Sequence, residues 1–290
     1  MKTAFECIPC FVRQATEAVE MATNDPALRE SLLRRLLREI SDTDWNVMPV
    51  TVSQRMQRLV RDETGRKDPY HLLKKKMNDT AMDLLPELME AVAKQQNPHD
   101  ALVRLAIAGN LLDAGSKSRL APEELSGRLH SIWDAPMTGK SEDLFRAINS
   151  AGKILYLADN AGEIVFDRLL IEALPVGKIT VAVRGMPVIN DATMEDARFA
   201  GLTNIVDVIS NGSDAPGTIL EECSEDFRRK FKKADLVISK GQGNYETLSD
   251  VDKNVFFLLA VKCPMISADV GAPVGSLVAI SGKDRMRKHR

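Results

Sequence analysis

Asp159, Asn160 and Asp191 are the residues of this sequence best suited to hold a divalent metal ion. The first two directly follow the apolar run 154–157, and Asp191 comes after the run 179–183. Hard divalent cations take oxygen ligands, and Mg²⁺ is commonly held by one or two carboxylates while it keeps several waters. The three residues therefore predict an open catalytic site for Mg²⁺, Mn²⁺, Co²⁺ or Ni²⁺. No histidine lies nearby in the sequence to indicate a catalytic zinc site.

A lysine followed by two glycines could bind an anion beside that metal. Lys240 ends another apolar run, and Gly241, Gly243 and Asn244 come directly after it. An ammonium group next to exposed backbone amides suits a phosphate. We therefore expect Lys240 to contact phosphate in catalysis and the other three residues to bind substrate. A dinucleotide fingerprint is not indicated, because Glu246 stands where its third glycine would be.

Structural roles compete with functional ones for several of these residues. Asn160 with Glu163, and Thr193 with Asp196, both have the spacing of a helix-capping box. Asn211 lies in the polar segment 210–214, whose composition is also typical of a turn. Glu163 and Asn211 are thus candidates for binding substrate or for holding the backbone.

The elements that must position these residues differ between the two halves of the chain. Apolar residues recur at spacings of three and four in segments such as 32–40 and 82–92, which predicts amphipathic helices. After residue 152, short apolar runs alternate with helix-like stretches, a pattern typical of a parallel sheet. The carboxyl ends of such strands meet at one edge, where ligands bind.

We predict an α/β fold in which a helical N-terminal part packs on a three-layer α/β domain with a mostly parallel sheet. The expected domains are 1–148 (helical, with little sheet), 149–282 (metal- and phosphate-binding) and a basic tail, 283–290. Strands are expected at 154–157, 179–183, 205–209 and 236–239, and helices at 164–174, 194–200 and 218–232. The run 255–261 fits either a strand or a buried helix.

Composition excludes several classes of protein. Of 290 residues, 44% are hydrophobic and 28% are charged, as in ordinary folded proteins. The 39 basic and 41 acidic residues give a formal charge of -2, which disfavours nucleic acid as a partner. The apolar run 255–261 is too short to span a membrane. The start of the chain lacks the apolar run of a secretory signal, and four cysteines are too few for a disulfide scaffold, so we expect a cytoplasmic protein.

Taken together, the motifs resemble those of the damage-control phosphatases, a family once catalogued as a domain of unknown function. The matching segments are Asp159-Asn160-Ala161-Gly162-Glu163, Asn190-Asp191-x-Thr193, Lys240-Gly241-Gln242-Gly243-Asn244-Tyr245-Glu246, Asp68-Pro69-Tyr70 with Lys74, and Gly109-Asn110 with Asp113. The early Cys7-x-x-Cys10 looks like the archaeal and bacterial branch. The resemblance implies a metal-dependent phosphatase of small phosphorylated metabolites, with Asp159, Asn160 and Asp191 as metal ligands and Lys240 on the phosphate.

Several residues of these motifs allow a second interpretation. Asn110 and Asp113, three apart on one helical face, could contact substrate or could join the two parts of the molecule. Asp68, which precedes a proline, is also typical of a turn or helix start. Cys7 and Cys10 lie near a helix start, where the helix dipole would favour thiolates and so allow a metal or redox role. We favour a packing role for them, because Cys223 and Cys263 do not form the second pair that a four-thiolate zinc site needs.

The expected reaction is hydrolysis of a sugar phosphate, a nucleotide or a damaged cofactor precursor. Asp159-Asn160 lacks the Asp-x-Asp pattern of an aspartyl-phosphate mechanism, which favours metal-activated water over direct attack by Asp159. One rival is a transferase that binds a nucleotide or methyl donor in the same crevice. Another is a non-catalytic ligand-binding module that depends on a metal or on thiols. The sequence does not indicate the oligomeric state.

Overall fold

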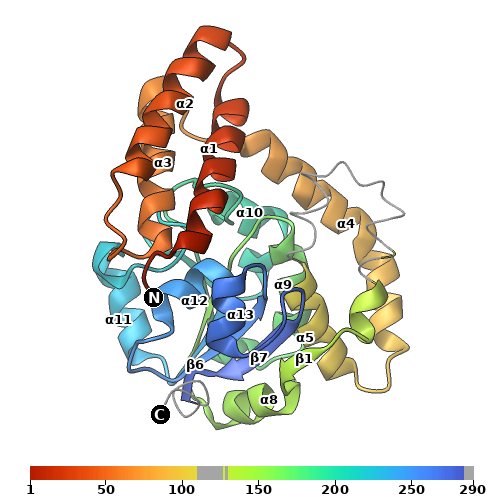
Figure 1. The fold of residues 1–290 in the computed structure, drawn as a ribbon. Helices are drawn as coiled ribbons and strands as arrows, with labels where there is room; N and C mark the ends of the chain where they lie inside the picture. The colour runs from red at the N-terminus through yellow and green to blue at the C-terminus, as the bar shows by residue number, and fades with distance from the viewer. Residues whose placement is uncertain (110–126, 128–129, 284–290) are drawn as a thin grey trace.

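Residues 1–109, 127 and 130–283 are described in the computed structural model of the chain. Its first three helices, α1 (Ile8–Ala22), α2 (Pro26–Ser41) and α3 (Pro49–Thr64), form a bundle that projects from the rest of the molecule (Figure 1). Both α2 and α3 begin with a proline, whose missing N–H costs nothing at a first helical position. The three helices bury a core of their own.

Helices α4 (His71–Ala93) and α5 (Pro98–Ala108) belong to the α/β part of the molecule. Their buried side chains, such as Leu88 and Val103, share one hydrophobic core with Tyr156 of the sheet. The helical region expected at 1–148 therefore divides into a projecting bundle and a pair of helices that cover the sheet. Asn110 and Asp113 lie just beyond α5, outside the described residues.

Among the described residues, the sheet has seven strands in the order β1-β7-β6-β5-β2-β3-β4, and only the β6–β7 pair is antiparallel. The strands are β1 (Met137–Gly139), β2 (Ile154–Leu157), β3 (Ile179–Val183), β4 (Asp207–Ser210), β5 (Leu236–Lys240), β6 (Val255–Ala260) and β7 (Leu277–Ser281). This confirms the predicted α/β fold with a mostly parallel sheet. The run that fitted either a strand or a helix is β6, and β1 brings a short strand into the sheet before residue 150.

Both faces of the sheet are covered, which gives the predicted three layers. Within β2, Ile154 and Tyr156 enter the core shared with α4 and α5, whereas Leu155 and Leu157 enter the core on the other face. Successive side chains of a strand point to opposite faces, so a doubly covered strand is apolar throughout. The other helices are α8 (Ser141–Ser150), α9 (Glu163–Glu172), α10 (Met194–Phe199), α11 (Glu225–Lys233), α12 (Gln242–Leu248) and α13 (Pro264–Val270).

One predicted helix is shorter than expected. The segment 218–232 contains a 3₁₀ turn, Leu220–Glu222, and α11 begins only at Glu225. The hydroxyl of Ser224 accepts a hydrogen bond from the backbone N–H of Phe227 at 3.2 Å and so caps the helix there. Further 3₁₀ turns are Phe5–Cys7, Ser131–Trp133, Val176–Lys178 and Leu202–Asn204. In the parts of the chain that the structure describes, no helix has the length and apolar character needed to cross a bilayer.

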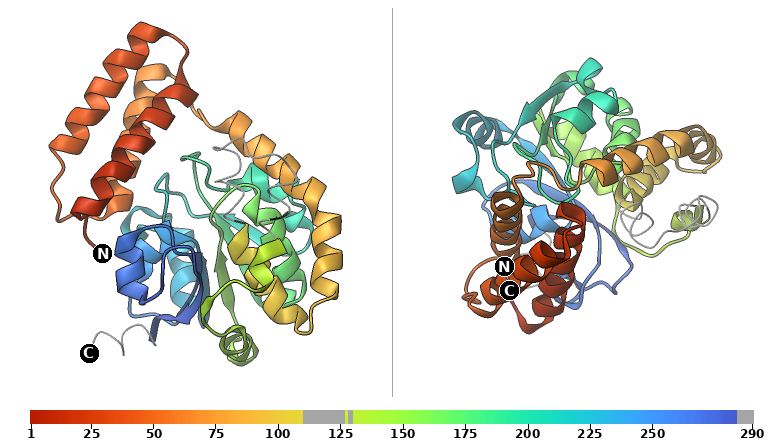
Figure 2. Two further views of the ribbon diagram at one scale, coloured as in Figure 1. Left: turned by 45° about the vertical axis from the view of Figure 1, so that its right-hand side comes forward. Right: turned by 90° about the horizontal axis from the view of Figure 1, so that it is seen from above.

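The carboxyl ends of β2, β3, β5 and β6 point toward the base of the helical bundle. Figure 2 shows the bundle standing over the end of the α/β part, with α4 running down the other side. Residues of α1 and α3 line the same cavity as the residues that follow these strands. The fold thus places the polar residues that follow these strands next to the helical bundle, with the cavity between them.

Candidate active site

Asp159, Asn160 and Asp191 line one cavity of about 410 Å³ between the strand ends and the helical bundle. All three are nearly buried, at 8%, 6% and 4% exposure. The structure therefore brings together the three oxygen-bearing side chains that were grouped from the sequence, although Asn160 and Asp191 are 31 positions apart in the chain.

Backbone hydrogen bonds hold the two loops against each other. The N–H of Ala161 donates to the carbonyl of Asn190 at 2.9 Å, and the N–H of Ala192 donates to the carbonyl of Asp159 at 2.7 Å. These bonds flank a bridge in which Asn160 is paired with Asp191. Because the loops extend the neighbouring strands β2 and β3, the position of the two carboxylates is fixed by the sheet itself.

Side-chain contacts fix the orientation of Asn160. Its Nδ2 donates to Oδ2 of Asp159 at 2.9 Å and to Oε2 of Glu163 at 3.1 Å. With the nitrogen held by two carboxylates, the amide oxygen is directed to the other side of the group. Asn160 can thus supply an oxygen while Glu163 fixes its rotamer.

Arg184 lies between the carboxylates of Asp159 and Asp191. Its Nε donates to Oδ2 of Asp191 at 2.6 Å, and its Nη2 lies 3.6 Å from Oδ1 of Asp159, with no hydrogen-bond partner among the described residues. Its Nη1 donates to Asn244 and Thr218 at 3.1 and 3.3 Å, which holds the buried guanidinium in place. Arg184 therefore neutralises part of the charge of Asp159 and Asp191.

The pKa values of Asp159 and Asp191 are both raised. Burial, followed by the charge of Glu163, raises the pKa of Asp159 to about 6. Burial also raises the pKa of Asp191 to about 7, although the charge of Arg184 opposes this. Two carboxylates that are costly to ionise side by side gain more from an added cation than exposed carboxylates would.

The donor set fits a hard divalent ion. In and beneath the cavity, five buried carboxylates lie with two buried cations, which leaves negative charge in excess: Asp159, Asp191, Glu246, Glu163, Asp167, Arg184 and Lys240. No cluster of three or more His, Cys, Asp or Glu among the described residues is arranged to hold a metal ion. Two carboxylates and one amide are instead the sparse oxygen set of an ion that keeps several waters.

Lys240 differs from its predicted role as a phosphate contact. It is fully buried, and its Nζ is 2.5 Å from both Oε1 of Glu163 and Oδ1 of Asp167 and 2.8 Å from the carbonyl of Ala106. Burial alone would lower the pKa of Lys240, but the charges of Asp167 and Glu163 raise it above its usual value. The three hydrogen atoms of the ammonium group are thus engaged beneath the site, and none points to the cavity.

Glu163 also lies beneath the cavity and does not line it. Burial raises its pKa, and Lys240 opposes that shift. Its carboxylate joins Asn160 to Lys240, so the substrate contact expected for Glu163 becomes a role in positioning Asn160. The capping box expected for Asn160 and Glu163 is absent, because Gly162 is the N-cap residue of α9.

The two glycines after Lys240 pack closely against other parts of the protein and do not form the anion-binding loop that we expected. A Cβ at Gly241, whose φ is 76°, would lie 1.9 Å from Oδ2 of Asp159. A Cβ at Gly243 would lie 2.0 Å from the carbonyl oxygen of Pro216. Gly241 therefore makes room for the Asp159 carboxylate, and Gly243, which lines the cavity, allows close contact of two backbone segments.

Asn244 and Asn211 do not reach the cavity, and this corrects their assignment to substrate. Asn244 is fully buried; its Nδ2 donates to the carbonyl of Lys240, and its oxygen accepts from Arg184. The oxygen of buried Asn211 accepts the backbone N–H groups of Gly185 and Ser213, both at 2.9 Å. Both residues hold the loops that carry the site, as the turn interpretation of Asn211 predicted.

Three polar contacts around α4 and α10 are structural. Thr193 and Asp196 form the predicted capping box at the start of α10. Oδ1 of Asp68 accepts the N–H of Tyr70 at 3.0 Å, which confirms its turn role before α4. Lys74 pairs with Asp196 at 2.9 Å and so ties α4 to α10.

The comparisons with known proteins agree with this geometry. Residues 3–278 match the family model of the damage-control phosphatase ARMT1-like domain. The chain belongs to this family. A damage-control phosphatase of Pyrococcus horikoshii is 33% identical over 295 residues, which cover 99% of this chain and 100% of that protein. Another, from Archaeoglobus fulgidus, is 33% identical, with coverage of 96% and 99%. A crystal structure of a DUF89 family protein from Pyrococcus horikoshii matches with a TM-score of 0.87 and 32% identity, over 97% of this chain and 99% of that one.

Residues that the sequence analysis did not assign also line or support the cavity of this family member. Lys262, an exposed lysine two residues after β6, lines it and lowers the pKa of Asp159 through its charge. Gln242 lines it with an Oε1 that has no hydrogen-bond partner in the part of the chain that the structure describes. Arg184 directly follows β3, and Asp167 lies one helical turn after Glu163. Two sequence signals could have found them: Arg184 stands at a strand end, and Asp167 is four residues after Glu163 on the same helical face.

Three cysteines line the same cavity: Cys7, Cys10 and Cys263. Sγ of Cys7 contacts Sδ of Met265 at 3.9 Å, and Sγ of Cys10 accepts from Arg13 at 3.7 Å. Burial raises the pKa of Cys7, contrary to the thiolate character expected from its position at a helix start. Cys223 lies in another part of the structure, in the core beneath α11.

Proposed function

We propose that this chain is a metal-dependent phosphatase that hydrolyses a small phosphorylated metabolite. The observation that carries the proposal is the convergence of Asp159, Asn160 and Asp191 on one cavity that also has Lys262 on its wall. The names of two relatives, both damage-control phosphatases, support the same reaction class.

Phosphate monoesters hydrolyse very slowly without a catalyst, and enzymes accelerate the reaction mainly by charge stabilisation and positioning. A divalent ion at the site would supply positive charge and lower the pKa of bound water. In this chain, Asp159 and Asp191 would hold the ion and Asn160 would add an oxygen. Arg184 fixes the spacing of the two carboxylates by contacting both.

Lys262 takes the phosphate role that the sequence analysis gave to Lys240. It lines the cavity, whereas Lys240 is buried against Glu163 and Asp167. An exposed ammonium close enough to influence Asp159 can approach an anion bound at the same carboxylates. Lys240 is assigned to holding Glu163, and through Glu163 the amide of Asn160.

The cavity suits a small substrate. Its volume of about 410 Å³ lies within the range of small-molecule sites, and the helical bundle forms one wall. Arg13 of α1 adds a second cation to that wall. Sugar phosphates, nucleotides and damaged cofactor precursors are the substrate classes to test.

The test is release of phosphate from an aryl phosphate and from a panel of phosphorylated metabolites. We expect turnover with Mg²⁺, Mn²⁺, Co²⁺ or Ni²⁺, no turnover with a chelator, and recovery when metal is restored. Asp226→Ala, a change in an exposed acid on α11, is the matched control and should keep full activity. Equal turnover with and without the chelator would contradict metal dependence.

The course of the reaction has its own test. Asp159 is held by Asn160 and lies near Arg184, and we propose that water attacks the phosphorus atom. Borohydride reduction during turnover should therefore trap no phosphoaspartyl enzyme. A reduced aspartyl residue at position 159 in the mass spectrum would show covalent catalysis instead.

A thiol-dependent module is the second candidate, because Cys7, Cys10 and Cys263 line the same cavity. Equilibrium dialysis separates the two functions. If the ion sits at the strand ends, Asp191→Ala loses the metal and the Cys7→Ser, Cys10→Ser variant keeps it. The reverse result would place the metal on the thiols and would remove the support for phosphatase chemistry.

A further inference from the structure

A second and larger cavity lies at the amino ends of the strands, whereas the proposed catalytic carboxylates lie at their carboxyl ends. Its volume is about 770 Å³. It is formed where β2, β3 and β4 begin, by the 3₁₀ turns that precede β3 and β4 and by the last turn of α11. Ligands of open α/β sheets bind at the carboxyl ends of the strands, so the proposed phosphatase reaction does not explain this cavity.

The wall of this cavity is basic. Four lysines line it, namely Lys153, Lys178, Lys230 and Lys233. Asp207 is the one acidic residue among the lining residues that the structure describes, and it lies 2.8 Å from Nζ of Lys230. Positive charge therefore exceeds negative charge around the cavity.

Two of the lysines have no protein partner for their charge within the described residues. Nζ of Lys178 donates to the carbonyl of Ala151 at 2.9 Å, but in that part of the chain the ammonium groups of Lys153 and Lys233 make no hydrogen bond or ion pair. Asp235, next to α11, does not neutralise them by contact. Its Oδ2 accepts the backbone N–H groups of Gly152 and Lys153 at 3.0 and 2.8 Å.

The rest of the cavity wall is uncharged and partly apolar. Val176 and Ile205, both half-buried, are apolar residues of the wall, and the polar side chains of Thr180, Thr203 and Asn204 lie among them. A nucleotide needs this combination: an apolar surface for its base, hydroxyl and amide groups for its sugar, and cations for its phosphates. The volume lies within the range of small-molecule sites.

We propose that this cavity binds a nucleoside diphosphate or triphosphate, with Lys153 and Lys233 on the phosphates and the apolar wall on the base. The site is separate from the catalytic carboxylates, because β2 and β3 present one cavity at each end. The proposal does not depend on the phosphatase reaction, and binding is expected in protein whose catalytic carboxylates have been removed.

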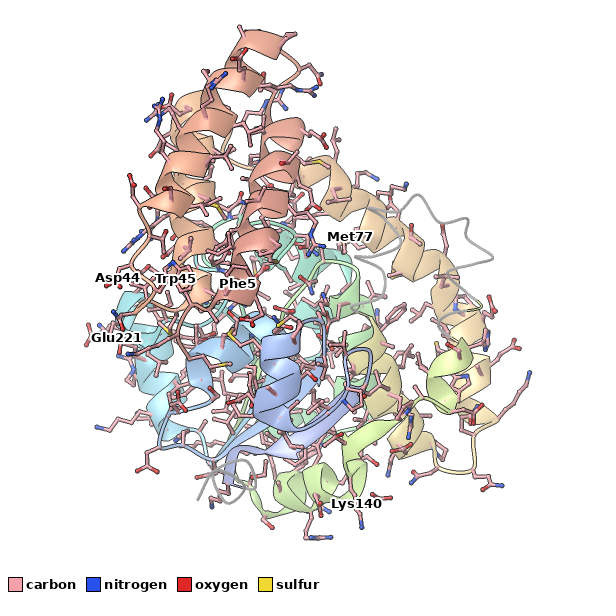
Figure 3. All side chains as sticks on the ribbon, in the orientation of Figure 1. Phe5, Asp44, Trp45, Met77, Lys140 and Glu221 are labelled. Carbon is pink, nitrogen blue, oxygen red and sulfur yellow. The ribbon has the colours of Figure 1, made fainter. Side chains whose placement is uncertain are left out.

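The experiment is calorimetric titration of the full chain with ADP in the presence of a chelator. Wild type should bind one ADP, and raising the salt concentration should weaken the binding. Lys153→Ala with Lys233→Ala should raise Kd about tenfold or more, because two charge-assisted contacts are lost. Lys140→Ala is the matched control and should bind as wild type. This exposed lysine, which is labelled in Figure 3, follows β1. In the sheet, β1 and β4 are the two outermost strands and lie on opposite sides.

The other arms separate the possible sites. Asp159→Asn should leave the Kd for ADP unchanged, and pyrophosphate should bind more weakly than ADP because it lacks a base. The proposal is overturned if wild type does not bind ADP, or if the double lysine variant, folded by its thermal melt, binds it normally. Loss of binding in Asp159→Asn would place ADP in the catalytic cavity. Equal binding of pyrophosphate would reject a nucleoside as the ligand.

Discussion

Two clusters, each with one basic and two acidic side chains, lie near the carboxyl ends of β2, β3 and β5 and differ in their access to the cavity. Arg184 lies between Asp159 and Asp191, which line the cavity. Lys240 lies between Glu163 and Asp167, and none of these three side chains reaches it.

The difference shows that charge composition alone does not mark a functional site. In the Lys240 cluster, all three hydrogen atoms of the ammonium group are satisfied by two carboxylates and a carbonyl. In the Arg184 cluster, Nη2 has no hydrogen-bond partner within the described ranges of the chain, and Asp159 and Asp191 line the cavity. Burial raises the pKa of the carboxylates in both clusters, so this shift does not separate them. The Lys240 cluster holds its cation out of reach of the cavity, whereas the carboxylates of the Arg184 cluster can accept an added cation from the cavity.

Removing a carboxylate of the open cluster should have the largest effect. We expect Asp191→Ala to lower kcat/KM for an aryl phosphate by about 1000-fold or more, because it removes charge stabilisation worth several kcal/mol. Its melting temperature should fall less than that of Lys240→Met, because Arg184 keeps the nearby carboxylate of Asp159, whereas Lys240→Met leaves two buried carboxylates without their cation. Steady-state kinetics and calorimetry check both values. Full activity would remove Asp191 from the site.

Removing the cation of the closed cluster should act on stability instead. Lys240→Met should lower the free energy of unfolding by about 3–5 kcal/mol, because two buried carboxylates lose their partner. Urea denaturation measures this value, and Lys262→Met, at an exposed position, should stay within about 0.5 kcal/mol. A Lys240→Met protein that is stable but inactive would restore Lys240 as a phosphate contact.

Asp214 offers a third cluster with the opposite pKa shift. It accepts hydrogen bonds from Gln54, Arg58 and Arg61 of α3 and so joins the bundle to the loop after β4. Although burial acts to raise it, the contacts with Arg58 and Gln54 and the charges of Arg58 and Arg61 lower the pKa of Asp214 to about 2.

Because the folded pKa of Asp214 lies below its unfolded value, the carboxylate stabilises the fold above about pH 4, and this contribution is lost as the pH falls toward 2. Asp214→Asn should therefore cost about 2 kcal/mol at pH 7 and progressively less below pH 4. Denaturation curves over this range measure the difference. A cost that stays constant with pH would show that the charge of Asp214 does not matter.

Lys262 should give the smallest effect. Lys262→Ala is expected to raise KM about fivefold, which is about 1 kcal/mol for a solvent-exposed charge contact, and to leave the melting temperature unchanged. Lys140→Ala is the control, because this lysine is also exposed and lines neither cavity. Unchanged KM in Lys262→Ala would leave the phosphate contact to Arg13 of α1.

The sequence was enough to predict β2, β3, β4 and β5 and the meeting of Asp159 with Asp191, because short apolar runs mark parallel strands and their carboxyl ends lie on one side of the sheet. It left β6 open between strand and helix and did not predict β1 or β7. It was not enough to separate Lys240 from Lys262. Both follow an apolar run, and which one is buried depends on Asp167 and on the carbonyl of Ala106 in α5. Contacts between elements distant in the sequence decide this, and local pattern does not contain them.

Contacts between distant elements also explain why the substrate-binding roles predicted for two asparagines were wrong. Asn211 and Asn244 follow strands, as a substrate-binding residue would, yet their amides satisfy buried backbone groups of neighbouring loops. The helical region shows the limit on a larger scale. The spacing of apolar residues located α2 and α4, but it did not show that α4 covers the sheet while α2 stands in a separate bundle.

The most direct test of the central claim is Mn²⁺ binding, followed by the electron paramagnetic resonance signal of the free ion. Wild type should bind one ion per chain. A variant with Asp159→Asn and Asp191→Asn should keep its circular dichroism spectrum and should bind no ion at the same concentrations. Retention of the ion by the folded double variant, with unchanged affinity, would contradict the assignment of the metal to these carboxylates.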